Sequence, residues 1–389
     1  MLKKKAAQKI QEQVKVICEL IGNPADFSVL PVGNEALFSL VYLSSLANDY
    51  SLERGIALLK DLGDSLVTTT QEQRNFQYYE DLEAAAKTLL EGNMLAVSAD
   101  AVFSIEAQGW LRRLPTEPVT ERLIRGPREG FTETLEDNIG MVRRWIRDPD
   151  LKVEALRVGR RTQTRVVIMY LSDLTQPGLV EEIQHRIKAI DIDGVLEAGY
   201  LEQLITDRRA TIFPLIQATE RSDRVAAALL EGRVAILIDK SPACLIVPAT
   251  VNELYQTPED YYFNYWLGSF LRLIRLLGNN LAVALPGLYI ALAVYHPELL
   301  PTNLAMAIAA SRSRVPIPLI AEVFILLLAV EFFREAGLRL PGSVAHTLGV
   351  VAGIVLGMTA VQAGFVSSAT LVVAAITAIA SFTGPNYSV

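Results

Sequence analysis

Residues 340–382 read LPGSVAHTLGVVAGIVLGMTAVQAGFVSSATLVVAAITAIASF, and this stretch decides the fold class of the chain. It contains no Asp, Glu, Lys or Arg and is rich in Val, Ala, Gly and Ile. Soluble proteins rarely expose large continuous apolar patches, so such a stretch at one end of a chain does not suit a water-facing surface. The last quarter of the 389 residues is therefore predicted to be an all-α polytopic membrane domain.

Four apolar runs in this quarter approach the ~20 residues that a helix needs to cross a bilayer. They are Leu276–Tyr295, Val315–Phe333, Ser343–Val366 and Phe365–Phe382. From residue 276 onward there are four Arg and four Glu, so the net charge of −7 belongs to residues 1–275. The alternative interpretation is a set of fully buried core helices in a large soluble fold.

Composition limits the compartment and the partners of the N-terminal part. Its acidic balance argues against a nucleic-acid-binding surface. Cys18 and Cys244 form neither a disulfide framework nor a zinc-ligand spacing, which favours a reducing cytoplasmic setting. The basic cluster Lys3-Lys4-Lys5 is followed by polar residues and not by an apolar run, so no signal peptide is predicted. We expect a cytoplasmic head.

Two short sequence blocks occur twice in this head, in the same order. VYLSSL at 41–46 is echoed by MYLSDL at 169–174, and LLEG at 89–92 is repeated at 229–232. Each LLEG block is followed by a predicted pair of short strands, 94–98 with 101–106 and 234–238 with 244–247. Matched blocks in a fixed order indicate a duplicated unit, and alternating strands and helices favour layered α/β subdomains.

The chain is accordingly divided into five parts. These are a first α/β subdomain (1–107), a linker with a helix (108–161), a second α/β subdomain (162–257), an interfacial amphipathic helix (258–277) and a transmembrane helical domain (278–389). The helix over Thr132–Ile146 has acidic residues first and basic residues last, as the helix dipole favours. It is expected to be a solvated linker helix, with a binding surface as the alternative.

The interfacial helix is predicted from aromatic side chains that precede Arg272 and Arg275. Aromatic rings lie at the boundary between headgroups and acyl chains, and arginines favour the cytoplasmic side. An ordinary amphipathic helix packed on the head is the alternative.

Motifs of the common enzyme classes do not occur in the sequence. There is no P-loop, no G-x-G-x-x-G, no G-x-S-x-G and no H-E-x-x-H. His185, His296 and His346 lie far apart and have no ligand-like neighbours. No enzyme activity, metal or cofactor is predicted.

Six motifs resemble those of GerA-type spore germination receptor A subunits. They are RGPREGF at 125–131, TERSD at 219–223, LEGRVAILID at 230–239, EDYY at 259–262, PGLYIA at 286–291 and EAGLRLP at 335–341. The similarity runs from about residue 36 to the end. The structural and signature candidates taken from it are Arg125, Pro127, Arg128, Glu129, Glu220, Arg221, Asp223, Glu335 and Arg339.

The resemblance implies a two-part cytoplasmic head, a multi-helix domain in the inner spore membrane, and contact with membrane lipid. It implies assembly with a B subunit, a transporter-like membrane protein that binds the nutrient, and with a C subunit, a lipoprotein. The implied role is to relay nutrient sensing into germination, as a signal relay or as an oligomeric ion channel. A stand-alone membrane transporter or permease with a cytoplasmic regulatory head is the alternative function.

Three features depart from the family pattern. Ser222 stands where the family usually has Pro, and Lys240-Ser241 stands where it has Gly-Thr in a hairpin turn. Lysine adopts a positive φ less readily than glycine, which affects the turn. The family normally continues beyond Val389 through further membrane helices and a polar tail, so the chain is expected to be a fragment or a shortened member.

Glu322 and Glu331 lie within the apolar run Val315–Phe333 and are the pore or intramembrane polar candidates. A carboxylate inside a membrane is costly and normally faces a protein interface or water. A separation of nine residues is a rotation of about 900°, which places the two side chains on opposite faces of a helix. Glu335 and Arg339, four residues apart, are expected to form a structural pair at the membrane edge.

Overall fold

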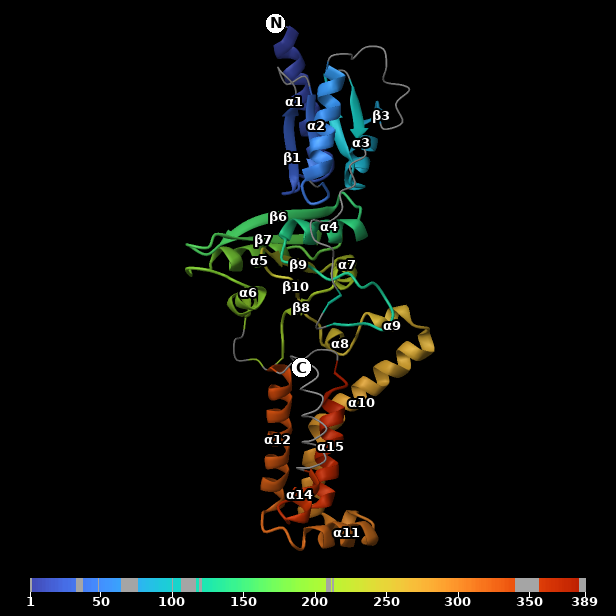
Figure 1. The fold of residues 1–389 in the computed structure, drawn as a ribbon, viewed down its shortest axis with the longest axis vertical. Coiled ribbons are helices and arrows are strands. Elements are labelled where there is room, and N and C mark those ends of the chain that lie inside the picture. Colours follow the sequence, from blue (N-terminus) through green and yellow to red (C-terminus); the bar gives the residue numbers. More distant parts are fainter. Residues whose placement is uncertain are drawn as a thin grey trace. The chain divides into compact units, whose positions relative to one another are not determined.

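The structure is a computed structural model that describes residues 2–32, 38–47, 49–63, 76–99, 101–105, 117–118, 121–207, 211, 213–339 and 357–384. The chain divides into two compact units, an N-terminal unit of residues Met1–Thr250 and a C-terminal unit of residues Val251–Val389. Figure 1 labels the helices and strands of both.

The first subdomain of the N-terminal unit is a five-stranded antiparallel sheet with helices on both faces. Its strand order is β1-β2-β4-β5-β3. Val41 faces α1 and α3, whereas the neighbouring Leu40 faces α2, because successive side chains of a strand alternate between faces. The elements are α1 (Leu2–Leu20), β1 (Phe27–Val32), β2 (Phe38–Leu43), α2 (Asp49–Gly63), β3 (Phe76–Tyr79), α3 (Leu82–Leu90), β4 (Met94–Val97) and β5 (Val102–Ile105).

The second subdomain repeats this architecture. Its antiparallel sheet has the order β6-β7-β9-β10-β8, with α4 and α7 on one face and α5 and α6 on the other. The elements are α4 (Leu135–Trp145), β6 (Leu151–Val158), β7 (Thr164–Leu171), α5 (Leu179–Lys188), α6 (Ala198–Ile205), β8 (Gln217–Thr219), α7 (Ser222–Leu230), β9 (Val234–Ile238) and β10 (Cys244–Val247). The two sheets share one strand order, so the predicted pair of similar α/β subdomains is confirmed.

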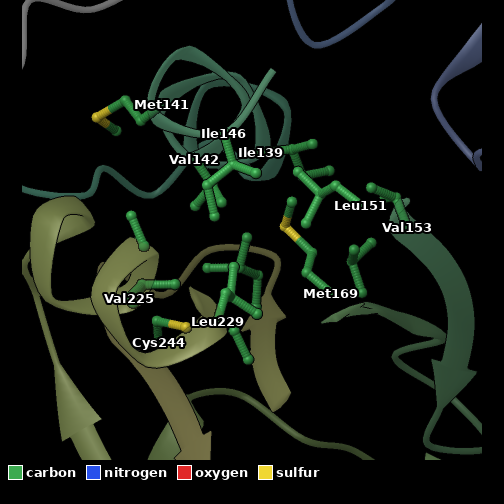
Figure 2. Packing of buried hydrophobic residues seen from close by; sticks show 14 of the residues in the cluster. Ile139, Met141, Val142, Ile146, Leu151, Val153, Met169, Val225, Leu229 and Cys244 are labelled. Carbon is green, nitrogen blue, oxygen red and sulfur yellow. The ribbon is translucent and has the colours of Figure 1, made fainter. Parts of the chain in front are cut away.

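Within residues 108–161 the structure differs from the expected linker. The strand β6 is an edge of the second sheet and pairs with β7 along its whole length. The helix α4 is not solvated, because Leu135, Ile139 and Val142 are buried against the sheet and α7. Figure 2 shows this layer, with Val142 and Leu229 in the same apolar cluster. The apolar side chains of α4 therefore belong to the core of the second subdomain.

The other side of α4 contacts the first subdomain. The Arg143 guanidinium donates to both carboxylate oxygens of Asp26, over 2.9 Å from Nε and 2.7 Å from Nη2, and Ser45 Oγ also donates to Asp26. A Cβ on Gly140 would lie 2.2 Å from the carbonyl oxygen of Ser45, so the helix backbone approaches this turn closely. The sequence pattern gives no sign of this junction between the two subdomains.

The C-terminal unit is helical throughout the residues that the structure describes. Its α-helices are α8 (Val251–Leu254), α9 (Glu259–Tyr262), α10 (Tyr265–Ile290), α11 (Thr302–Arg312), α12 (Leu319–Arg339), α14 (Gly357–Gln362) and α15 (Ser368–Ser381). A π-helical turn, Ala291–Tyr295, prolongs α10, and a 3-10 turn, Pro297–Leu299, follows it. The helix α15 packs beside both α10 and α12 (Figure 1).

Among the described residues, one helix is long and apolar enough to cross a membrane, the continuous stretch Tyr265–Tyr295. It contains the first predicted span and most of the predicted interfacial segment, so these two form one helix without a break at residue 277. The predicted span 315–333 begins only at Leu319, because Pro316 and Pro318 precede α12. Residues 343–356 of the third predicted span lie outside the described residues, and α15 represents the fourth with 14 residues.

Candidate functional site

Two of the signature motifs of the head, 125–131 and 219–223, meet at the start of α7. A bridge pairs Gly130 with Arg221, and the backbone N–H of Phe131 donates to the carbonyl oxygen of Glu220 over 2.7 Å. The segment 121–131 thus lies beside the end of β8 and the beginning of α7, although about ninety residues separate the two motifs in the sequence.

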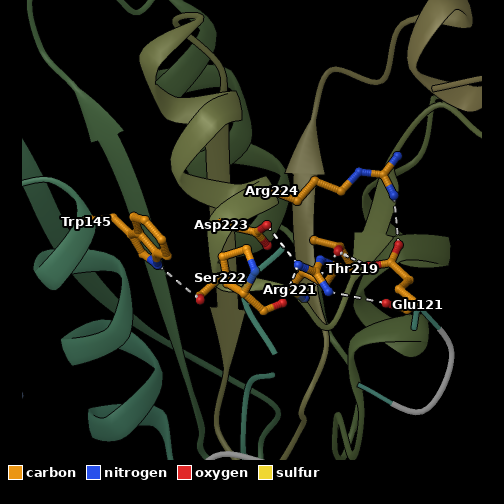
Figure 3. Close-up of polar contacts among 8 residues, drawn as sticks. Glu121, Trp145, Thr219, Arg221, Ser222, Asp223 and Arg224 are labelled. Atoms are coloured by element: carbon orange, nitrogen blue, oxygen red, sulfur yellow. Dashed lines mark hydrogen bonds and ion pairs between the residues drawn. The ribbon is translucent and has the colours of Figure 1, made fainter. Parts of the chain in front are cut away.

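Arg221 is the centre of this contact, and its side chain is only 1% exposed. Its guanidinium donates to the carbonyl oxygen of Pro127 over 2.8 Å. It also donates to the carbonyl oxygen of Glu121 (3.3 Å) and to Asp223 Oδ2 (2.8 Å), and Figure 3 shows these two contacts. A buried arginine is costly unless its charge is paired and its N–H groups are bonded. The neighbouring carboxylate pairs the charge, and that carboxylate and the two loop carbonyls bond Nη1 and Nη2, whereas Nε is buried without a hydrogen-bond partner among the described residues. Arg221 thus holds the loop against the start of α7.

Glu121 extends these contacts to β8 and α7. One of its carboxylate oxygens accepts from Arg224 Nη1 over 2.7 Å, and the other accepts from the Thr219 hydroxyl. Nearby, the indole N–H of Trp145 donates to Ser222 Oγ over 3.2 Å (Figure 3). We call the set Glu121, Pro127, Thr219, Arg221, Asp223 and Arg224 the Arg221 cluster.

The structure separates the signature residues of the head into two groups. Arg221 and Asp223 are buried, and Pro127 contributes its carbonyl oxygen. Arg125, Arg128 and Glu129 are exposed. Glu220 lies beside Arg221 and pairs with Phe131 through its backbone.

Glu121, Arg224 and Thr219 were not predicted as site residues. Glu121 lies outside the motif 125–131, and Arg224 follows the motif 219–223 directly, so the motif boundaries excluded both. The signal that could have found Arg224 is helical spacing, because positions 221 and 224 lie on one side of a helix start.

In the C-terminal unit, Glu322 is fully buried where helices meet. Its Oε1 accepts from the backbone N–H of Ser367, at the N-cap of α15, over 2.6 Å. Its Oε2 lies 3.5 Å from Nε of Arg312 on α11. The Ser367 and Thr370 hydroxyls are 2.7 Å apart, and Tyr289 of α10 contacts Thr370 over 3.2 Å. Glu322 therefore connects α11, α12 and α15 through polar contacts.

Glu331 lies on the exposed side of α12, 3.2 Å from Nη1 of Arg334. Burial of Glu322 and exposure of Glu331 agree with opposite faces of one helix. Glu335 is exposed on the same helix. The side chain of Arg339, its expected partner, lies outside the described residues.

The cysteines and one carboxylate of the head differ from free side chains in their protonation. Burial raises the pKa of the Cys244 thiol, so this side chain stays protonated at neutral pH. Burial, and then the nearby Glu197, raise the pKa of Glu202 on α6. Both cysteines are free thiols. Within the described residues, no group of three His, Cys, Asp or Glu side chains is arranged to hold a metal ion.

The protein belongs to the class in which a duplicated α/β domain is followed by a helical unit with a long apolar helix. Comparison with known families then identifies its family. The model of the Bacillus/Clostridium GerA spore germination protein family matches residues 12–389, and the chain belongs to this family.

Individual relatives agree with this assignment. The chain is 42% identical over 302 residues to spore germination protein KA of Bacillus subtilis (strain 168), covering 77% of this chain and 56% of that protein. It is 34% identical over 396 residues to spore germination protein GerLA of Bacillus cereus, covering 97% and 80%. The chain thus spans little more than half the length of KA.

A solved structure is also similar. It is the crystal structure of the N-terminal domain of the A subunit of the Bacillus megaterium spore germinant receptor GerK3, at 31% identity and a TM-score of 0.44. The match covers 61% of this chain and 93% of that domain.

Proposed function

We propose that the chain acts as the A subunit of a nutrient germinant receptor of bacterial spores and relays nutrient sensing into germination. The observation that carries this proposal is the family match, which runs through both units from residue 12 to residue 389. A match restricted to the head would leave the helical unit unexplained.

Membrane insertion is supported by the surface of α10. Only 17% of the most apolar 18-residue part of the helix Tyr265–Tyr295 is buried inside the chain, whereas the core helix of a soluble protein would be mostly buried. Large apolar side chains of α12 and α15, such as Phe324 and Ile376, are also exposed. Because apolar surface of this kind is unfavourable in water, we assign the C-terminal unit to the inner spore membrane.

The contact between α9 and the beginning of α10 has the features of a segment at the membrane boundary. Asp260 on α9 is buried and pairs with Arg272 (3.1 Å) and Arg275 of α10. Tyr265 and Trp266 at the first turn are exposed, as aromatic residues at headgroup level are. Two arginines precede the apolar part of the helix, and basic residues favour the cytoplasmic end of a span. This supports a cytoplasmic head.

The proposed partners are the B subunit, a nutrient-binding membrane protein, and the C subunit, a lipoprotein. Further copies of the chain would form a homo-oligomeric ion channel. Within such an assembly Glu331, being exposed, is the carboxylate that can face water or another copy, whereas Glu322 holds helices together. No catalytic step is assigned to the chain.

The experiment uses spores in which this chain is the sole A-type subunit. We expect nutrient-triggered potassium release in these spores, and its loss when the chain is deleted while the B and C subunits remain. Release that persists after the deletion would overturn the receptor role. The purified chain is then tested for potassium flux in liposomes, where flux without partners supports the channel and gradient-driven uptake of a nutrient identifies a transporter instead.

A further inference from the structure

The loop 122–128 follows Glu121 of the Arg221 cluster. Its Ile124 side chain is 86% exposed, more than any other large apolar side chain among the described residues. Three arginines of the loop are exposed as well, Arg122, Arg125 and Arg128. Glu129, also exposed, follows directly, so residues 122–129 carry a net charge of +2 on a chain with a net charge of −7.

Hydrogen bonds to a buried side chain hold this loop at both ends. The carbonyl oxygen of Glu121, before the loop, and that of Pro127, near its end, accept from the guanidinium of Arg221, which is 1% exposed. Gly130 then forms a bridge with Arg221. A loop that is already ordered loses less conformational entropy on binding. Ile124 and the arginines are therefore presented by a loop that needs little ordering when it binds.

The composition of the loop suits an anionic lipid surface. A single exposed apolar side chain is common on proteins and needs no explanation by itself. Here it lies between Arg122 and Arg125 in the sequence. Basic side chains are attracted to anionic headgroups, and apolar side chains among them enter the boundary with the acyl chains. Because the rest of the chain carries a net negative charge, an anionic surface attracts this loop in preference to the remainder of the head.

The loop is also attached near the residue at which the head ends. Thr219 donates its hydroxyl to the carboxylate of Glu121, directly before the loop. Four residues earlier, the carbonyl oxygen of Leu215 accepts from the backbone N–H of Ala249 over 3.0 Å. Four residues of extended chain span at most about 14 Å. Because the N-terminal unit ends at Thr250, the attachment point of the loop lies a short distance from the residue that leads into the C-terminal unit.

We propose that the loop 122–128 lies on the anionic headgroups of the membrane that holds the C-terminal unit. Ile124 enters the boundary between headgroups and acyl chains, and Arg122 and Arg128 meet the lipid phosphates. Arg221 is then a positioning residue, because its buried guanidinium holds the loop in place for this contact. The inference rests on the proposed function, since it requires the C-terminal unit to lie in the membrane, and it adds a lipid contact to the head.

One apolar side chain and a net charge of +2 form a weak contact by themselves, because stable anchoring to a membrane takes two signals. In the full chain the C-terminal unit supplies the stronger signal. This tether raises the effective concentration of the loop at the bilayer, so a weak contact is sufficient. An acidic segment of another protein would also attract the arginines. The bilayer is the favoured partner, because it is the anionic surface to which the chain itself is tethered.

The test measures the depth of the loop in the full chain reconstituted in liposomes. A nitroxide spin label is attached to Ile124→Cys in a chain that also carries Cys18→Ser, and the buried Cys244 stays unlabelled. Collision of the label with oxygen, which concentrates among acyl chains, is compared with collision with a nickel chelate dissolved in water. In equal parts of phosphatidylcholine and phosphatidylglycerol we expect the label to favour oxygen. In phosphatidylcholine alone, or at high salt, it should favour the nickel chelate.

The change of lipid leaves the protein as it is, and variants then identify the charges. Arg122→Gln with Arg128→Gln should lower the ratio of bound to free loops about 25-fold, because each basic residue adds separately to the attraction. This ratio is read from the two components of the label's spectrum. Arg144→Gln with Arg147→Gln, two exposed arginines outside the loop, is the matched control and should leave the ratio unchanged. A label on Val29→Cys, 43% exposed in the first subdomain, should favour the nickel chelate in both lipids.

A label on Val283→Cys of α10, 84% exposed, separates this inference from the proposed function. If Val283→Cys favours oxygen while Ile124→Cys favours the nickel chelate in both lipids, the loop contact is overturned and the membrane assignment stands. If both labels favour the nickel chelate, both are overturned. An Ile124→Cys label shielded from both reagents would show that protein covers the loop, which also overturns the lipid contact. A label that favours oxygen equally in both lipids would overturn the role of the arginines.

Discussion

The buried pair of Arg143 and Asp26 allows a sharp test of how the two subdomains are joined. Their side chains are 2% and 4% exposed, and the guanidinium makes two hydrogen bonds to the carboxylate. Arg143→Met preserves much of the side-chain length but leaves the Asp26 carboxylate buried with the Ser45 hydroxyl as its remaining partner among these contacts. Breaking a buried pair in this way costs about 3–5 kcal/mol, because the remaining charge is uncompensated.

The measurement is thermal and urea unfolding of residues 1–250, followed by circular dichroism. For a unit of this size, each kcal/mol lowers the Tm by about 2–4 °C, so Arg143→Met should lower it by roughly 6–20 °C. Arg144→Met is the matched control on the same helix. Its side chain is exposed, and we expect a change within about 0.5 kcal/mol.

The double variant Arg143→Met with Asp26→Leu shows whether the loss of stability comes from the unpaired charge or from lost packing. Replacing both partners by apolar groups removes the stranded carboxylate, so the double variant should be more stable than Arg143→Met alone. A double variant whose loss equals the sum of the two single losses would refute the argument. So would an Arg143→Met protein as stable as the Arg144→Met control.

Three further outcomes are expected. Lys240 has φ +68°, so Lys240→Gly should relieve the left-handed conformation and stabilise the head by about 0.5–1 kcal/mol, read from urea unfolding. Gly140→Ala would bring a methyl group to 2.2 Å from the Ser45 carbonyl oxygen and should cost about 1–3 kcal/mol in the same assay. Glu322→Gln keeps an acceptor for the N-cap of α15 but loses the charge opposite Arg312, so chain levels should stay normal while nutrient-triggered potassium release slows. Unchanged release at normal levels would exclude a role of the Glu322 charge.

The strands that the sequence predicts well are those buried on both faces. Val234–Ile238 and Cys244–Val247 are short apolar runs that follow α7, which ends at Leu230 just before Gly232, and the structure places β9 and β10 over these residues. Gly232 has φ +81°, the conformation in which glycine ends a helix. The apolar composition, the length of the runs and the glycine after the helix all indicate strands at these positions, so the local sequence pattern was sufficient to predict them.

The Arg221 cluster could not be assembled from pattern alone. Both of its motifs were recognised, but a contact between the carbonyl oxygen of Pro127 and the guanidinium of Arg221 depends on a sheet that brings position 127 to the edge strand β8. The decisive atoms of the loop are backbone oxygens, which every residue carries. Composition and spacing therefore contain no signal for them.

The helix α4 was predicted to be a solvated linker helix, whereas it is part of the duplicated architecture. In the second subdomain α4 and α7 cover the face that α1 and α3 cover in the first, so each sheet has two helices on its equivalent face. The helix α4 also contacts the other subdomain, through Gly140 and Arg143. The buried Leu135, Ile139 and Val142 recur at helical spacing, so the apolar stripe of a core helix is present in the sequence, and the charged residues between these positions drew the interpretation away from it. The charged residues that indicated a solvated linker include Arg143, which joins the two halves of the head.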